Sequence, residues 1–268
     1  MRPLAEFPLQ ARRAIAGVLT DIDETLTTEG RLTAAAYAAM ERLHDAGVRV
    51  VPVTGRPAGW CDHIARMWPV AAVVGENGAF YMRFHAAARK LETVHNLSAA
   101  ARKENRQRLD RVAQEILRAV PGSALASDQA YREADIAIDY REDVSPLPRA
   151  AVDEIVRRMQ AAGLTAKVSS IHVNGWFGAY DKLGMTRRLL AEAFGVDARA
   201  EREDWLFVGD SPNDAPLFGF FPHAVGVANV ADFGDRMEHL PAYVTQARSG
   251  AGFVELAGAL LAARTHGG

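Results

Sequence analysis

An apolar run that ends in two closely spaced aspartates constrains this chain more than any other feature. It lies in the stretch AIAGVLTDIDETLTT at residues 14–28. Residues 15–19 predict a buried strand, and strand alternation places Asp21 and Asp23 on the same side of the chain just past its end. Two carboxylates this close repel each other, and a fold tolerates them mainly when a cation lies between them. At this point an acidic turn after a strand is an equally good interpretation.

Polar side chains also follow directly on three later runs that predict buried strands. In open α/β sheets the ligand crevice lies outside the carboxyl ends of the strands, so these side chains are expected to meet at one edge. Independent acidic turns would not be expected at the end of every core strand. The polar positions are Thr54 after residues 48–53, Glu76 and Asn77 after residues 70–74, and Asp210 and Asp214 after the strand that begins near residue 205.

Helical patterns alternate with these strands and predict a parallel sheet with helices on both faces. Between residues 82 and 180 the pattern changes to a long charged helix, a second helix and alternating, half-exposed strands. We therefore predict an α/β fold with a Rossmann-like core and an inserted α+β domain. The core is expected at residues 1–81 and 181–268, the insertion at residues 82–180, and the main helices near residues 34–46, 98–120, 149–162, 182–194 and 252–263.

The composition excludes several classes of partner. The chain of 268 residues has 49% hydrophobic residues and a formal net charge of -2, and no basic face stands out. Nucleic acid and anionic membranes are therefore not expected as partners. No segment is long and apolar enough for a signal peptide or a membrane span. The single cysteine, Cys61, excludes an internal disulfide and favours a cytoplasmic location, and it is expected to pack on a helix.

Other polar and aromatic side chains allow more than one interpretation. Trp60, Ile64 and Met67 have the spacing of a buried helix face. Glu76 and Asn77 could reach a ligand or cap a turn. Several residues of the predicted insertion are ambiguous as well: Arg132, Asp135 and Asp139 fit the solvated face of a strand, whereas His172, Asn174 and Trp176 fit either sugar binding or core packing.

Four of these segments together resemble the motifs of the haloacid dehalogenase (HAD) superfamily of phosphotransferases. They are DIDETLT, TGR, the lysine of YDKLG and GDSPND. The large insertion between the second and third segments is similar to the class II, Cof-like subgroup. That subgroup includes relatives of sucrose-phosphate phosphatase, trehalose-phosphate phosphatase, mannosyl-phosphoglycerate phosphatase and phosphomannomutase. Across the insertion the resemblance is one of architecture only.

The resemblance implies a role for each matching residue. Asp21 corresponds to the nucleophile that becomes an aspartyl phosphate, and Asp23 to the general acid and base. Thr54 would bond to the phosphoryl group, and Lys182 would offset its charge. The implied substrate-binding residues are Thr54, Gly55, Arg56, Asn77, Lys182 and Asn213.

The resemblance also implies a Mg²⁺ site built from oxygen ligands. Asp21, the Asp23 carbonyl and Asp210 would hold the ion, and Asp214 would be a direct or an indirect ligand. One position departs from the usual pattern, because Glu24 stands where a glycine commonly follows the second aspartate. This departure affects the expected geometry of the loop and not the chemistry.

The expected function is that of a Mg²⁺-dependent phosphatase that hydrolyses a small phosphorylated metabolite, with a sugar phosphate as the expected substrate. A phosphomutase would use the same aspartyl phosphate and remains open. A non-catalytic protein that binds phosphorylated metabolites would have lost at least one charged catalytic position, and all of them are present here. The sequence gives neither the leaving group nor the oligomeric state.

Overall fold

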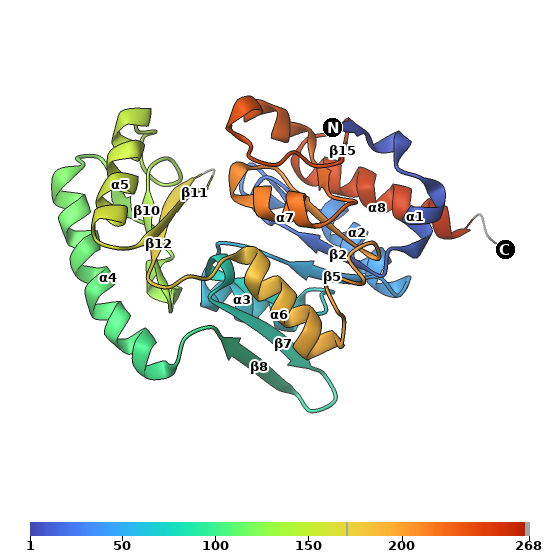
Figure 1. The fold of residues 1–268 in the computed structure, drawn as a ribbon, viewed down its shortest axis with the longest axis horizontal. Helices are drawn as coiled ribbons and strands as arrows, with labels where there is room; N and C mark the ends of the chain where they lie inside the picture. The colour runs from blue at the N-terminus through green and yellow to red at the C-terminus, as the bar shows by residue number, and fades with distance from the viewer. Residues whose placement is uncertain (170, 266–268) are drawn as a thin grey trace.

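The computed structural model describes residues 1–169 and 171–265, and its centre is a six-stranded parallel sheet (Figure 1). All its neighbouring strands pair in parallel, which confirms the predicted α/β class. The aspartate-bearing strand lies near the middle of the sheet. The strand order is β1 (Arg2–Pro3), β15 (Tyr243–Val244), β14 (Val225–Gly226), β13 (Trp205–Gly209), β2 (Gly17–Thr20) and β5 (Arg49–Pro52).

Successive residues of the central strands enter two different hydrophobic clusters, one on each face of the sheet. Val18 lies in the cluster on one face and Leu19 in the cluster on the other, as period-two alternation requires. The first face is covered by α2 (Ala34–Asp45), α3 (Ala58–Met67) and α8 (Ser249–Thr265), beside which α1 (Leu9–Ala14) packs. The second face is covered by α6 (Lys182–Phe194) and α7 (Ala215–Phe220).

A three-stranded antiparallel sheet continues the core beyond β5. A single parallel bridge joins Val53 to Val74, and Val74 belongs to the first strand of this sheet. The predicted boundary at residue 82 therefore falls inside a strand that extends the core, and the division at residues 82 and 180 stays a prediction. The strands are β6 (Val73–Gly75), β7 (Phe80–His85) and β8 (Lys90–His95).

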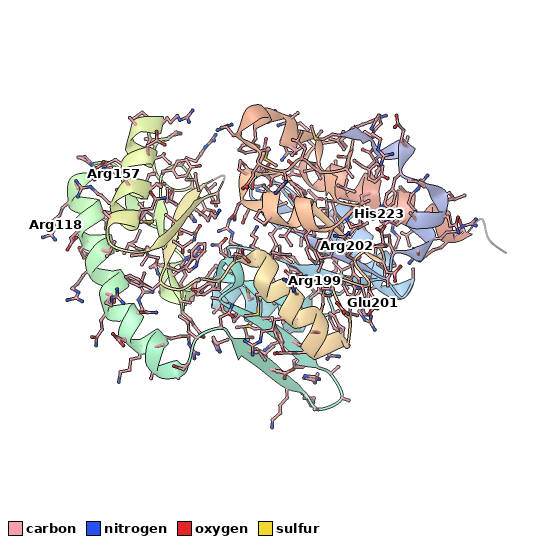
Figure 2. The ribbon with its side chains drawn as sticks, viewed as in Figure 1. Arg118, Arg157, Arg199, Glu201, Arg202 and His223 are labelled. Atoms are coloured by element: carbon pink, nitrogen blue, oxygen red, sulfur yellow. The ribbon has the colours of Figure 1, made fainter. Side chains whose placement is uncertain are left out.

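The α+β segment of residues 99–176 forms a second layer beside the edge of the core, and we call it the cap (Figure 1). Its sheet has the order β11 (Thr165–Val168), β12 (His172–Trp176), β10 (Asp135–Asp139) and β9 (Ala124–Leu125). Helices α4 (Ala99–Ala119) and α5 (Arg149–Ala161) cover one face of this sheet with an apolar cluster. Their outer sides carry charged residues such as Arg118 and Arg157, which project away from the cap (Figure 2).

Short elements complete the chain. The hairpin of β3 (Thr27–Thr28) and β4 (Arg31–Leu32) follows the first aspartate loop. The 3-10 turns are η1 (Leu4–Glu6), η2 (Glu76–Gly78), η3 (Gln129–Tyr131), η4 (Pro212–Asp214), η5 (Ala228–Asp232) and η6 (Gly234–Arg236). Within the described ranges, no helix has both the length and the apolar character needed to cross a lipid bilayer.

The predicted core face of α3 is partly wrong. Ile64 is buried, but Trp60 is 41% exposed and Met67 is 64% exposed. The buried face instead carries the small residues Ala58 and Cys61, which let the helix approach the sheet. Cys61 thus packs on a helix as expected.

Gly17 allows β2 and β13 to pack closely, because a Cβ atom at this position would overlap the ring of Trp205. We expect Gly17→Ala to lower the free energy of unfolding by about 2 kcal/mol through overpacking. Gly258 in α8 is the matched control, because a Cβ there meets nothing within 4 Å. Gly258→Ala should raise stability by about 0.5 kcal/mol, since glycine costs helix entropy. Urea unfolding of both variants checks this, and equal effects would contradict it.

Candidate active site

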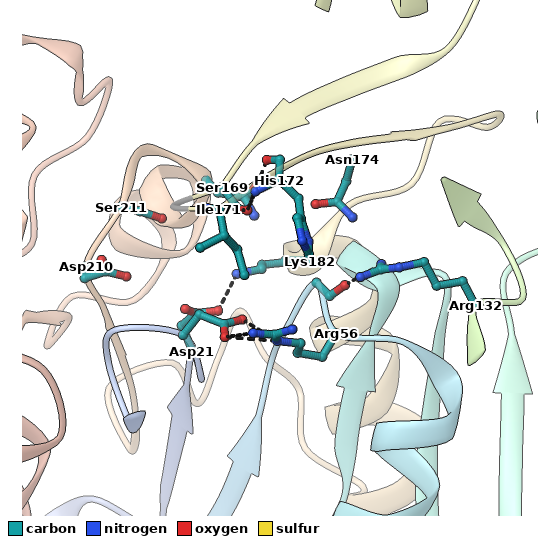
Figure 3. A pocket seen from close by; sticks show the side chains of 13 residues that line it. Asp21, Arg56, Arg132, Ser169, Ile171, His172, Asn174, Lys182, Asp210 and Ser211 are labelled. Atoms are coloured by element: carbon teal, nitrogen blue, oxygen red, sulfur yellow. Dashed lines mark hydrogen bonds and ion pairs between the residues drawn. The ribbon is translucent and has the colours of Figure 1, made fainter. Parts of the chain in front are cut away.

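The carboxyl ends of β2, β5 and β13 open into one pocket that the cap covers (Figure 3). The parallel pairing of these strands places the polar residues that follow them at one edge of the sheet, as the sequence predicts. The core contributes Asp21, Asp23, Gly55, Arg56, Lys182, Asp210, Ser211 and Asn213, and the cap contributes Arg132, Ser169, Ile171, His172 and Asn174.

One lysine binds two buried aspartates at the base of the pocket. The Lys182 ammonium donates to Asp21 Oδ1 at 2.8 Å and to Asp214 Oδ1 at 2.9 Å. Asp210 lies beside this pair, so that oxygens of Asp21, Asp210 and Asp214 all lie within 4.8 Å of one another. All four side chains are nearly inaccessible to solvent. A single ammonium therefore faces three buried carboxylates.

Burial and this imbalance of charge shift the pKa values of Asp21, Asp210 and Lys182. Burial raises the pKa of Asp21 to about 7, although the charge of Lys182 opposes the rise. Burial and the neighbouring carboxylates raise the pKa of Asp210 well above its ordinary value. Burial acts to lower the pKa of Lys182, but Asp21 and Asp214 outweigh it and hold that pKa above its usual range. The cluster is therefore a strong attractor for added positive charge.

Asp214 stabilises its own loop through hydrogen bonds to the backbone. Its Oδ2 accepts hydrogen bonds from the backbone N–H groups of Asp210 and Ser211, at 3.2 Å and 3.3 Å. Its Oδ1 accepts from Lys182. Gly209 makes this possible, because a Cβ at that position would lie 2.5 Å from Asp214 Oδ2. Asp214 therefore lies behind the pocket, whereas Asp21 and Asp210 line it.

Thr54 and Asn77 also lie behind the lining residues. Thr54 is fully buried, and its hydroxyl accepts a hydrogen bond from the backbone N–H of Arg56 at 3.0 Å. Asn77 Oδ1 accepts from Asn213 at 3.1 Å, while the Asn77 amide nitrogen has no partner among the described residues. Gly55 packs against Asn77, since a Cβ there would lie 3.1 Å from its Oδ1. These residues shape the turn between β5 and the pocket.

Arg56 contacts three carboxylates and one aromatic ring. Its guanidinium binds both oxygens of Asp23, with Nη2 at 2.8 Å from Oδ1 and Nε at 3.2 Å from Oδ2. It also reaches the cap, where it contacts Glu142 at 2.9 Å and Asp128 at 3.5 Å. Its face stacks on the ring of Trp60 at 4.4 Å. The family resemblance implies that Arg56 binds substrate. In the structure its guanidinium lines the pocket, and its N–H groups bind carboxylates.

Glu76 fastens the cap to the core. Its carboxylate accepts from the backbone N–H of Ala58 in the core, at 3.0 Å. It also accepts from three consecutive backbone N–H groups of the cap, those of Glu133, Ala134 and Asp135, at 2.6 to 3.2 Å. Burial raises the pKa of Glu76 to about 7. Of the two interpretations of Glu76, the structure supports the structural one.

The predicted solvated face of the cap strand is wrong, because Arg132, Asp135 and Asp139 are all buried. Arg132 binds Asp128 and Asp135 within the cap and donates to the Gly55 carbonyl of the core at 2.9 Å. The sheet pairs Asp135 with Trp176 and Asp139 with His172, so these side chains share the face that turns toward the core. The alternation of the sequence correctly predicted a strand at residues 135–139, but it wrongly predicted that the polar face of this strand is exposed to solvent.

Trp176 is buried on the face of the cap sheet that turns toward the core and is not an exposed sugar platform. It is 1% exposed, stacks on Tyr180 and donates from its indole nitrogen to the Tyr180 carbonyl. His172 and Asn174, by contrast, line the pocket. Asn174 donates to Asp135 at 2.9 Å, which leaves its carbonyl oxygen as an acceptor.

Glu24 adopts the left-handed conformation, with φ of 56°, which explains why glycine is usual at this position. Neighbouring side chains hold it in place. Asn229 donates to the Glu24 carbonyl at 2.7 Å, and the Ser249 hydroxyl donates to the Glu24 carboxylate at 3.0 Å. Asn229 also lies 3.4 Å from Asp210 Oδ2, and no motif or periodicity in the sequence pointed to this contact. The loop geometry therefore survives the substitution.

The acidic cluster fits a hard divalent cation. It offers closely spaced carboxylate oxygens, which are the ligands that Mg²⁺ prefers, and its excess negative charge is neutralised by such an ion. Asp21 and Asp210 line the pocket and could ligate the ion directly, whereas the carboxylate of Asp23 is turned toward Arg56. A contribution from Asp23 would come from its backbone carbonyl.

Cation binding to this cluster should depend on pH. Protons compete with the cation below the raised pKa of Asp21, about 7, and the competition disappears above it. We therefore expect Mg²⁺ affinity to rise between about pH 6 and about pH 8, with release of protons on binding. Calorimetry in two buffers of different ionisation enthalpy measures both quantities. Asp62→Asn, which alters an exposed carboxylate on α3, is the control. An affinity independent of pH would contradict the prediction.

Comparison with known proteins agrees with this geometry. Residues 18–117 match the family model of the haloacid dehalogenase-like hydrolases. Over 243 residues the chain is 24% identical to a phosphoglycolate phosphatase of Methanospirillum hungatei, covering 90% of this chain and 94% of that protein. Over 246 residues it is 27% identical to a phosphoglycolate phosphatase of Methanosarcina mazei, covering 89% and 93%.

A solved structure shares the whole fold. The C-terminal domain of trehalose-6-phosphate phosphatase from C. albicans superposes with a TM-score of 0.70 at 14% identity, and the match covers 98% of both chains. At this identity the likeness concerns the fold alone. The core, the cap and their order along the chain are therefore shared with a known architecture.

Proposed function

We propose that this chain is a phosphatase of the haloacid dehalogenase-like type, which hydrolyses a small phosphorylated metabolite through an aspartyl phosphate on Asp21. The observation that carries the proposal is the cluster of Asp21, Lys182 and Asp210 at the base of a pocket closed by the cap. A carboxylate nucleophile beside a fixed ammonium suits phosphoryl transfer, which depends on positioning and on neutralising charge.

In the first step, an Asp21 oxygen attacks phosphorus, and the bond between phosphorus and the leaving-group oxygen breaks. Asp23 gives its proton to that oxygen, so an alcohol departs. In the second step, Asp23 takes a proton from water, which attacks phosphorus and releases phosphate and free Asp21. Lys182 stays beside Asp21 throughout and offsets the phosphoryl charge. When bound, Mg²⁺ on Asp21, the Asp23 carbonyl and Asp210 supplies further charge neutralisation.

The site supports a hydroxyl-bearing leaving group such as a sugar. Each cation that lines the pocket already binds at least two carboxylates. Arg56 binds Asp23 and Glu142, Arg132 binds Asp128 and Asp135, and Lys182 binds Asp21 and Asp214. A leaving group with its own carboxylate would have to displace one of them. Hydroxyl groups can instead donate to these carboxylates and to the Asn174 carbonyl oxygen.

A second candidate substrate is a small phosphorylated acid such as phosphoglycolate. Both curated relatives carry that activity in their names. A smaller hollow that shares Lys182 and Asn213 with the pocket is lined by Lys167, whose ammonium could meet a carboxylate. A phosphomutase using the same aspartyl phosphate is the alternative reaction, and it would return the phosphoryl group to the substrate instead of to water.

The test is a panel of phosphorylated sugars and phosphoglycolate, assayed with and without Mg²⁺ for release of inorganic phosphate. We expect release that depends on the metal and that falls by at least about 10³-fold in Asp21→Asn, because the attacking oxygen is removed. Asp62→Asn serves as the control variant. Silence of the whole panel, including a generic aryl phosphate, would favour a binding protein. Isomerised substrate without free phosphate would identify a mutase.

A further inference from the structure

Glu142 lies behind the wall of the pocket and joins two residues that line it. Its Oε1 accepts from Nη2 of Arg56 at 2.9 Å, and its Oε2 lies 2.9 Å from Nε2 of His172. Arg56 belongs to the core and His172 to cap strand β12. Glu142 itself does not line the pocket. It therefore influences the reaction only through its two neighbours.

The same nitrogen of Arg56 serves both Glu142 and Asp23. Nη2 lies 2.8 Å from Asp23 Oδ1 and 2.9 Å from Glu142 Oε1. The side chain of Arg56 is only 5% exposed, and Trp60 fixes its plane from one face. A planar guanidinium held in this way transmits the position of one carboxylate to the other. The orientation of Asp23 thus depends on a residue of the cap.

The loop that carries Glu142 is itself rigidly held. The buried carboxylate of Asp139 accepts hydrogen bonds from the backbone N–H groups of Arg141, Glu142 and Asp143, each at 2.8 Å. Asp139 stands at the end of β10, opposite His172 in the cap sheet. The three bonds fix where Glu142 is presented to the core. The cap is therefore built to deliver this carboxylate to Arg56.

We propose that Glu142 is a positioning residue, which acts through Arg56 to hold the carboxyl group of Asp23 toward the leaving-group oxygen when the cap covers the site. The inference rests on the proposed phosphatase function, in which Asp23 protonates that oxygen. Without Glu142, Arg56 keeps only its longer contact with Asp128 among its two cap carboxylates, at 3.5 Å, and the orientation of Asp23 is less closely fixed. Attack by Asp21 does not involve this chain of contacts, because Lys182 and not Arg56 binds Asp21.

The experiment compares two leaving groups in single-turnover reactions with enzyme in excess. An alkyl phosphate, the best sugar phosphate or other substrate of the panel, needs a proton on its leaving oxygen. An aryl phosphate such as para-nitrophenyl phosphate releases a stable phenolate and does not. We expect Glu142→Gln to slow release of the alcohol from the alkyl phosphate by about 10-fold or more, with little change in the enzyme concentration that gives half the maximal rate. Release from the aryl phosphate should stay close to that of the wild type.

Two further variants make the result decisive. Arg56→Lys keeps the positive charge but lacks the shared guanidinium nitrogen. Because Arg56 also lines the pocket, both substrates should slow, and the alkyl phosphate should lose clearly more rate than the aryl phosphate. Glu154→Gln is the matched control, since among the described residues Glu154 on α5 pairs only with its helix neighbours Arg157 and Arg158, and it should match the wild type on both substrates. The aryl phosphate also reports that each variant is folded.

The outcomes separate the two proposals. A wild-type protein that releases neither leaving group overturns the proposed phosphatase. An active wild type in which both Glu142→Gln and Arg56→Lys are unchanged, or lose both substrates in parallel, overturns the positioning role alone. A selective loss on the alkyl phosphate in both variants supports it.

Discussion

The pairing of one lysine with two buried aspartates is the constraint on which this structure depends. Lys182 lies 161 residues from Asp21 along the chain, and the two meet because the first residue of α6 lies beside the loop that follows β2. Unpaired buried carboxylates would be costly, and their cost falls when an ammonium lies between them. Asp181 caps α6 by accepting from the backbone N–H of Gly184, so the lysine stands in the first turn of that helix. In the proposed reaction, the same lysine offsets the charge of the phosphoryl group.

A second set of charges holds the cap over the core. Glu76 accepts hydrogen bonds from three backbone N–H groups of the cap, and Arg132 of the cap donates a hydrogen bond to the Gly55 carbonyl of the core. Arg56 completes the set by binding carboxylates on both sides. Because each contact joins the two layers directly beside the pocket, the elements that close the site also organise it. Closure excludes water, which strengthens every electrostatic interaction inside.

Burial, rather than secondary structure, separates the predictions that hold from those that fail. The strands and helices of the core lie where periodicity places them, because apolar alternation and helical spacing are local properties. Met67 and Trp60 have core spacing on α3, yet the sheet meets the small residues of the neighbouring face. Asp139 reads as an exposed strand residue, although its carboxylate is buried by the loop that it organises. Both errors arise because a helix or strand pattern does not say which surface approaches it.

The sequence by itself determined the parallel core and the aspartates and threonine that follow its strands, because each of these depends on residues that are neighbours in the chain. The family resemblance added Lys182, which opens α6. Only the tertiary structure decided how these residues divide their tasks. It turned the carboxylate of Asp23 toward Arg56 and placed Asp214 behind the pocket. It also brought Glu142 to the core from a loop that no motif marks. The contacts of Asp23 and Glu142 with Arg56 join residues 33 and 86 positions apart, where charge and distance act across space and leave no periodic trace in the chain.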